Sequence, residues 1–350
     1  MDFSGFIGLI LKNDNVGLSI ASLLIIGVIF VNGWTDAPNA ITASVSTGAL
    51  KLRSGIILAA IFNFIGALVM GIINTSVLRS VEGITFMIGS DSERALPILS
   101  AALLSIILWA VIAWYFGIPT SESHALISGI FGAALASNGG LKGMELSALR
   151  LAVAGLAISL PIGFFGGFLI GKILEVVSYN TKSQNKEIII RCFQRLGAAA
   201  MAFMHGAQDS QKFAGVFLAA ICMSGSEGAD FESVPIWLTL LCSMVISLGT
   251  AAGGYRIIKR VGMDTVALTP VKGLAADISA ALSMLLASAF GMPVSTTHTA
   301  TASVVGAGIS SYPKKINTGS IREMMIAWIL TFPCCGLISF CAAKLYILLF

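Results

Sequence analysis

The 350-residue chain is too hydrophobic for a soluble globular protein. Hydrophobic residues make up 56% of it, charged residues 11%, and the mean hydropathy is +0.91, whereas soluble domains carry about 25% charged residues. The net charge of +4 comes from basic residues in short segments between apolar runs, which indicates membrane topology and gives no reason to expect a nucleic acid partner. The composition argues against an aqueous enzyme, a disordered chain and a collagen-like repeat.

Apolar runs long enough to cross a bilayer follow one another along the chain. A membrane helix needs about 20 such residues, and the runs are 16–34, 55–74, 97–117, 118–137, 147–176, 196–223, 234–255, 271–291, 293–310 and 321–350. Asp2 precedes the first apolar stretch without a basic flank or a small-residue cleavage site, so we expect no cleaved signal peptide. The sequence predicts an all-α, multi-pass protein of the cell (inner) membrane, surrounded by the lipid bilayer.

Two motifs occur twice, in the same order. Asn32-Gly-Trp-Thr-Asp36 corresponds to His205-Gly-Ala-Gln-Asp209, and Pro119-Thr-Ser-Glu-Ser-His124 corresponds to Pro293-Val-Ser-Thr-Thr-His298. The offsets, 173 from Asp36 to Asp209 and 174 from His124 to His298, indicate a duplicated half. We expect a first membrane repeat at 1–176, a cytoplasmic basic linker at 177–195 and a second, inverted repeat at 196–350.

The basic residues predict the orientation of the halves, because such residues are retained in cytoplasmic loops. The segment 172–195 is the best cytoplasmic candidate, with Lys172, Lys182, Lys186, Arg191 and Arg195. Threading outward from it places the basic residues of 51–53, 256–260 and 314–315 inside and the acidic residues of 227–232 outside. Each half then crosses an odd number of times, which predicts inverted repeats with both termini outside.

Two pairs of apolar runs are separated only by short turns, Gly117-Ile-Pro119 and Gly291-Met-Pro293. If both runs of a pair crossed the membrane, the two Pro-x-Ser-x-x-His motifs would lie at opposite faces. If each pair is a re-entrant helical hairpin, both tips lie near the midplane, and the number of crossings per half stays odd. We favour hairpins, because inverted-repeat transporters build their sites near the midplane.

The hairpin motifs carry the features of an anion site. A proline that begins a helix exposes free amides and the positive end of the helix dipole, which favour an anion. A single copy would more often be a kink satisfied by hydroxyls, but the recurring spacing favours a functional role. The candidate anion-binding residues are Thr120, Ser121, Ser123, His124, Ser295, Thr296, Thr297 and His298, with Gln211 of the other motif.

The other motif pair offers ligands for a small cation. Ionisable residues within apolar spans are functional candidates by default, and Asp36 and Asp209 stand beside glycines and amides at expected helix breaks. Unwound carbonyls and side-chain oxygens hold Na⁺ or H⁺ at such breaks, although amides can also serve as interhelical hydrogen bonds. The candidate cation ligands are Asn32, Asp36, Asn39, Glu122, Gln208 and Asp209, with Lys212 placed to balance an Asp.

These motifs resemble those of the inorganic phosphate transporter (PiT) family of sodium- or proton-coupled phosphate symporters. The segment Gly33–Ala40 is similar to the family's Gly-Ala-Asn-Asp-x-x-Asn-Ala, and His205–Lys212 to its His-Gly-Ala-Asn-Asp-x-Gln-Lys. The segment Pro293–His298 matches the family's Pro-x-Ser-Thr-Thr-His at every fixed position, and Pro119–His124 matches it more loosely. The resemblance implies inverted repeats, phosphate as substrate, coupling ions at the Asp and amide positions, the anion at the hairpin tips and a homodimer.

The chain departs from the family pattern at several positions. Trp34 replaces an Ala, Thr35 and Gln208 replace Asn residues, and Glu122 stands where the second copy has Thr296. Glu122 puts a carboxylate beside the expected anion site, so we treat it as a sodium ligand or a proton carrier. Sodium is favoured over the proton because hard oxygen ligands outnumber groups that titrate near neutrality. No tightly bound cofactor is expected besides this coupling ion.

The sequence therefore predicts a secondary active transporter, not an enzyme, that symports phosphate with a cation by alternating access. A symporter for sulfate or arsenate is an alternative that competition in uptake would separate. An intramembrane Ser/His hydrolase is another, although the motifs lack a consistent set of nucleophile, base and orienting residue. A passive channel would show flux without a coupled gradient.

Overall fold

A computed structural model describes residues 2–11, 16–89, 92–141, 144, 146–180, 185–225, 234–253, 255–263, 265–311 and 316–349. The long helices in these ranges match the predicted apolar runs. They are α2 (Val16–Thr35), α4 (Leu52–Ile73), α6 (Ser92–Tyr115), α7 (Glu122–Asn138), α8 (Ser147–Asn180), α9 (Lys186–Met223), α10 (Ile236–Ala252), α12 (Pro270–Ala289), α13 (Thr296–Ile309) and α14 (Thr318–Leu349). Six described segments are long and apolar enough to cross a membrane.

Short helical segments connect the long ones. They are α1 (Phe3–Leu11), the 3₁₀ turn η1 (Ala37–Ile41), α3 (Thr42–Ser46), α5 (Ser76–Thr85), η2 (Phe86–Ile88), α11 (Tyr255–Ile258) and the π-helical turn η3 (Lys259–Met263). Among the described residues, extended pairing is limited to an isolated bridge between Val266 and Ile316. Because α8 runs to Asn180 and α9 begins at Lys186, most of the predicted linker 177–195 belongs to helix ends.

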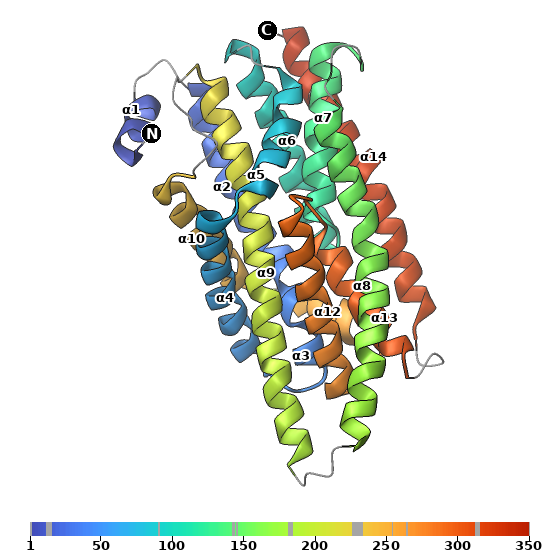
Figure 1. Cartoon of the computed structure of the whole chain (residues 1–350). Coiled ribbons are helices and arrows are strands. Elements are labelled where there is room, and N and C mark those ends of the chain that lie inside the picture. The colour runs from blue at the N-terminus through green and yellow to red at the C-terminus, as the bar shows by residue number, and fades with distance from the viewer. Residues whose placement is uncertain are drawn as a thin grey trace.

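The two helical hairpins, α6–α7 and α12–α13, meet tip to tip near the middle of the bundle (Figure 1). Ser295 Oγ donates to Ser121 Oγ over 2.7 Å, and Ser123 Oγ donates to Val294 O over 3.1 Å. By contrast, α8 and α9, with 34 and 38 residues, extend for about 51 and 57 Å at ~1.5 Å per residue. The meeting tips confirm the re-entrant arrangement, since two crossing pairs would have separated the motifs.

Each hairpin packs against the last long helix of the opposite half of the sequence. The α6–α7 hairpin contacts α14, and the α12–α13 hairpin contacts α8. Similarly, α2 packs on α10 and α4 packs on α9. The segments 1–176 and 196–350 are therefore interleaved in one bundle, while their relation as inverted repeats stays a prediction.

The described basic segments gather at one end of the bundle. Arg191 donates to Gly48 O and Arg195 to Ala49 O, each over 2.9 Å, and η3 packs against α3 beside them. In Figure 1, the facing ends of α8 and α9 lie at this end, whereas α1 and the C-terminal end of α14 lie at the other. Both ends of the described chain thus share one end of the bundle, and which side of the membrane it faces stays a prediction. Outside the described residues lie Lys182, Glu227, Asp230, Glu232, Lys314 and Lys315.

Glycines bring α4 and α9 into backbone contact. A Cβ placed on Gly66 would lie 1.9 Å from Phe203 O, and one on Gly206 would lie 2.2 Å from Asn63 O. Only a residue without a side chain fits at these distances. The spacing of α4 and α9, and with it the position of the second motif, therefore depends on these two residues.

Gly66→Ala is expected to destabilise the protein by about 1–3 kcal/mol or more, because backbone has to move to admit the methyl group. The melting temperature of the purified protein in detergent measures this effect. Gly8→Ala in α1 is the matched control, since a Cβ there meets nothing within 4 Å. Equal melting temperatures for the two variants would contradict the close approach of α4 and α9.

Candidate functional site

The first motif interrupts a membrane helix, as predicted. The α-helix α2 ends at Thr35, and the chain continues after Asp36 as η1 and α3. Pro38 has no amide hydrogen and disfavours α-helical geometry in the residue before it, which explains why α2 cannot continue. The interruption leaves Asp36, only 1% exposed, at the end of a helix inside the bundle.

The second motif lies in an unbroken helix, so the predicted break at Asp209 is wrong. The helix α9 runs from Lys186 to Met223 without interruption. By the repeat offset, the position of Pro38 is occupied in the second copy by Gln211, which keeps its amide hydrogen and lets the helix pass. The glycine of this motif, Gly206, instead serves the close contact with α4.

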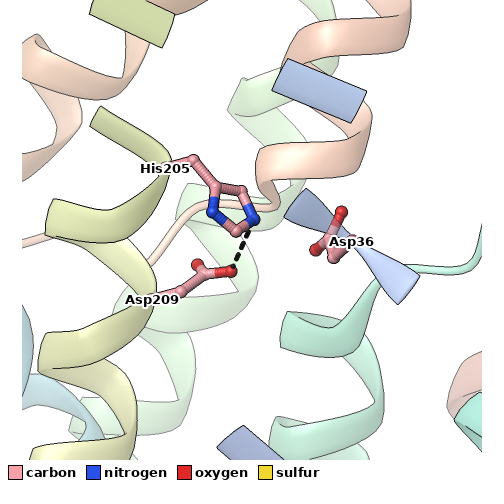
Figure 2. A group of neighbouring side chains, drawn as sticks. All are labelled: Asp36, His205 and Asp209. Carbon is pink, nitrogen blue, oxygen red and sulfur yellow. Dashed lines mark ion pairs between the residues drawn. The ribbon is translucent and has the colours of Figure 1, made fainter. Parts of the chain in front are cut away.

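The two motifs meet and form a buried cluster of Asp36, His205 and Asp209 (Figure 2). One potential ligand atom from each side chain lies within 4.8 Å of the others. Predictions from the sequence included both carboxylates among the cation ligands but omitted His205. Its spacing was the available signal, because residues four apart on a helix share a face, and its Nε2 lies 3.3 Å from Asp209 Oδ2.

Asp209 is compensated by Lys212, as expected. Lys212 Nζ lies 2.7 Å from Asp209 Oδ1, and Asn32 Nδ2 donates to Asp209 Oδ2 over 3.0 Å. Lys212 Nζ also donates to Ser123 Oγ and to Val294 O, each over 2.7 Å. One ammonium group, 1% exposed, therefore joins α9 to both hairpin tips.

Asp36 is held by the second hairpin and by its own motif. Thr296 Oγ1 donates to Asp36 Oδ2 over 2.9 Å, and Thr297 Oγ1 donates to Asp36 Oδ1. Asn39 Nδ2 also donates to Oδ1, over 2.8 Å. Two residues predicted to bind the anion are thus in direct contact with a predicted cation ligand, which makes the two candidate sites neighbours that share hydroxyl groups.

The helices behind the hairpin tips begin three residues after their prolines. Glu122 and Thr296 are the first residues of α7 and α13, so the prediction that Pro119 and Pro293 begin these helices is wrong. Two cap serines explain the later start, since Ser121 Oγ accepts from His124 N and Ser295 Oγ from His298 N, over 3.2 and 3.1 Å. The first two amides of each helix still lack intrahelical acceptors by their position. Thr297 Oγ1 also lies 3.1 Å from Thr120 O, so the two tips are in contact here as well.

Several predicted cation ligands carry buried oxygens without a hydrogen-bond partner among the described residues. Glu122 Oε1 lies 3.1 Å from Thr35 Oγ1, which also lies 2.8 Å from Val31 O. Gln208 Nε2 donates to Ser288 Oγ over 2.8 Å. The unpartnered atoms are Asn32 Oδ1, Asn39 Oδ1, Glu122 Oε2 and Gln208 Oε1. Because leaving a buried acceptor unpaired costs about 1–3 kcal/mol, these oxygens are suited to a cation.

The remaining residues predicted to bind the anion, His124, His298 and Gln211, line two cavities outside the carboxylate cluster. The rings of His124 and His298 lie with centroids 4.4 Å apart and line an apolar cavity of about 510 Å³ between α8 and α14. Gln211 lines a separate cavity of about 10 Å³, beside Thr239 of α10. Residues two apart on a helix point in different directions, so Gln211 does not share the face of Asp209.

Comparison with known proteins agrees with this geometry. A sequence profile of the phosphate transporter family matches residues 32–339, a range that includes all four motifs. The chain belongs to this phosphate transporter family. The resemblance carried by the motifs is thereby confirmed, and the transporter is an integral membrane protein with several apolar helices.

Relatives of the transporter are similar over most of their length. A probable low-affinity inorganic phosphate transporter of Bacillus subtilis (strain 168) is 36% identical over 307 residues, covering 87% of this chain and 89% of the relative. A protein of the same description from Rhizobium meliloti (strain 1021) is 32% identical, over 92% and 96% of the two chains. A solved structure described as the sodium-dependent phosphate transporter superposes with a TM-score of 0.77 at 21% identity. The superposition covers 95% of this chain and the whole of the solved chain, which shows the shared fold.

Proposed function

We propose that the transporter is a secondary active symporter that moves inorganic phosphate with sodium across the cell membrane by alternating access. The observation that carries this proposal is the contact of Thr296 and Thr297, at the N-terminus of α13, with the carboxylate of Asp36. An anion site and a cation site that share groups cannot fill independently. The descriptions of its relatives support phosphate, and that of the solved structure supports sodium.

Charge balance explains why the two ions travel together. Asp36 and Asp209 against Lys212 leave one net negative charge in the buried cluster, and an ionised Glu122 beside Thr35 adds a second. This charge repels an anion strongly at low dielectric. A sodium ion at the carboxylates offsets one of these negative charges. The unpartnered oxygens of Asn32, Asn39 and Glu122 supply further ligands of the hard type that sodium accepts. Gln208, next to Asp209 on α9, instead points toward Ser288 of α12.

The bound cation also changes what the hairpin tips offer. When sodium takes the oxygens of Asp36, the hydroxyls of Thr296 and Thr297 are released from that carboxylate. They and the first amides of α7 and α13 then face the anion together with Ser121, Ser123 and Ser295, in the manner of anion sites at helix N-termini. Rocking of the hairpins against α2 and α9 would expose the filled site alternately to the two sides.

Uptake of labelled phosphate into proteoliposomes tests the function. An inward sodium gradient is expected to drive accumulation, whereas an inward proton gradient or no gradient is not. Accumulation driven by protons alone would show that the proton, and not sodium, is the coupling ion. Flux without any coupled gradient would indicate a channel. Absence of phosphate uptake would overturn the proposal, and stronger competition by sulfate or arsenate than by phosphate would reassign the substrate.

Hydrolysis has less support in the geometry. The hydroxyls of Ser121 and Ser295 hydrogen-bond to each other and accept from the amides of His124 and His298, so they serve as helix caps. The homodimer and the outward location of both termini remain predictions.

Glu122→Gln is expected to raise the sodium concentration for half-maximal uptake about tenfold, because a charged ligand contributes ~1.4 kcal/mol or more over a neutral one. The phosphate KM at saturating sodium should change less than twofold. Glu187→Gln is the matched control, since Glu187 is an exposed carboxylate on α9. An unchanged sodium requirement would remove Glu122 from the cation site.

A further inference from the structure

A chain of hydrogen bonds crosses three helices behind the carboxylate pair. Thr250 Oγ1, on α10, lies 2.8 Å from Ile246 O, and Asn63 Nδ2, on α4, lies 3.0 Å from Thr250 Oγ1. Asn63 Oδ1 in turn lies 3.0 Å from His205 Nδ1, on α9. The three side chains are at most 2% exposed, so water does not compete for these bonds.

The chemistry of the groups fixes which atom donates and which accepts in each of these hydrogen bonds. Ile246 O is a carbonyl and can only accept, so the one proton of Thr250 is used there. Thr250 Oγ1 must then accept from Asn63, which turns the amide nitrogen of Asn63 toward α10 and its oxygen toward His205. An amide oxygen cannot donate, and His205 Nδ1 therefore carries the proton.

The consequence appears at the opposite nitrogen of the ring. When the ring is neutral, the proton on Nδ1 is its only one. Nε2 of His205 then presents a lone pair to the cluster, 3.3 Å from Asp209 Oδ2. Nε2 has no hydrogen-bond donor among the described residues. A lone pair beside two carboxylates is repulsive unless a cation lies between them. Histidines that bind metal ions usually donate their other ring N–H to an oxygen in this way.

We infer that His205 Nε2 is a ligand of the cation site and that Asn63 and Thr250 are positioning residues that fix its tautomer. The inference rests on the proposed function. Gly206 supports the arrangement, because only a glycine admits the approach of α9 to the backbone of Asn63. The repeat offset pairs His205 with Asn32, so equivalent positions of α9 and α2 bring an imidazole and an amide to the carboxylate of Asp209.

Nitrogen NMR reads the tautomer directly. The chain has three histidines, so protein labelled with ¹⁵N-histidine gives few ring signals, and loss of one set in His205→Asn assigns those of His205. In sodium-saturated protein at pH 8 we expect a protonated Nδ1 and an unprotonated Nε2. The Nε2 signal should shift as sodium is added and not as choline is added. A protonated Nε2 in the sodium-loaded protein would overturn the inference.

Variants of the positioning residues separate this role from a structural one. Thr250→Val and Asn63→Leu are expected to raise the sodium dissociation constant about 10- to 100-fold, as loss of outer partners does at metal sites. Thr250→Ser keeps the hydroxyl and should restore sodium binding to within threefold. The Asn63→Leu protein should also lose the single-tautomer signal of His205. Melting temperatures in the absence of sodium monitor folding.

The outcomes distinguish this inference from the proposed function. Wild-type protein that accumulates phosphate with sodium but shows a protonated Nε2 would overturn the inference alone. Unchanged sodium binding in Thr250→Val and Asn63→Leu would do the same. Wild-type protein that binds no sodium would overturn both.

Discussion

Asp36→Asn is expected to abolish sodium-driven phosphate accumulation while leaving the protein folded. In the proposed cation site Asp36 and Asp209 together attract sodium. A charge pair at 4 Å with an effective dielectric of 20 is worth about 4 kcal/mol, or roughly a thousandfold in sodium affinity. The variant keeps the shape of the side chain. It also removes repulsion between two carboxylates whose ligand atoms lie within 4.8 Å, so no buried charge loses its partner.

Uptake under a fixed inward sodium gradient measures this loss, and sodium titration of the purified protein shows whether affinity is the cause. Glu187→Gln removes an exposed carboxylate on α9 and should leave both readings unchanged. Uptake by Asp36→Asn within twofold of the wild type would exclude Asp36 from the cation site.

Lys212→Met is expected to destabilise the protein by about 3–5 kcal/mol, the usual cost of removing one partner of a buried ion pair. The ammonium of Lys212 compensates Asp209 and holds Ser123 and Val294 O at the hairpin tips. Without it, Asp209 lies buried beside Asp36 with no fixed positive charge. The melting temperature in detergent should fall sharply, with Lys51→Met, at an exposed position, as the control.

The double variant Lys212→Met/Asp209→Asn tests whether the unpaired charge of Asp209 causes this loss of stability. Removing both charges should recover most of the stability, because neither is left unpaired, while sodium-driven uptake stays lost. A double variant no more stable than Lys212→Met would show that the lysine acts by packing and not by charge.

Much of the architecture could be predicted because it depends on patterns that repeat. The apolar runs gave helices close to their observed bounds, and the two Gly-x-Pro turns predicted hairpins whose tips meet. The break after α2 followed from Pro38. In the second copy Gln211 replaces this proline and the helix continues. Two related motifs therefore need not have the same backbone conformation.

The groups behind the site could not be predicted from motifs. Asn63 lies in the middle of the apolar run 55–74, and Thr250 is one of four serine and threonine residues in the run 234–255. In such runs a hydroxyl or an amide usually serves helix packing. Their role depends on contacts between α4, α9 and α10, which no local pattern encodes. Likewise, the cap role of Ser121 and Ser295 depends on where the helix starts, the least predictable feature of a helix.

The exchange of helices between the two halves limits how the chain can fold. A half that ended after α8 would leave its hairpin without α14, and Asp36 without Thr296 and Thr297. Its carboxylate would stand in the bilayer uncompensated, which membranes tolerate poorly. During synthesis the first half therefore cannot complete its packing until the second half has been made. The last helix to emerge, α14, covers the first hairpin, so truncation near the C-terminus should damage the N-terminal site as much as its own half.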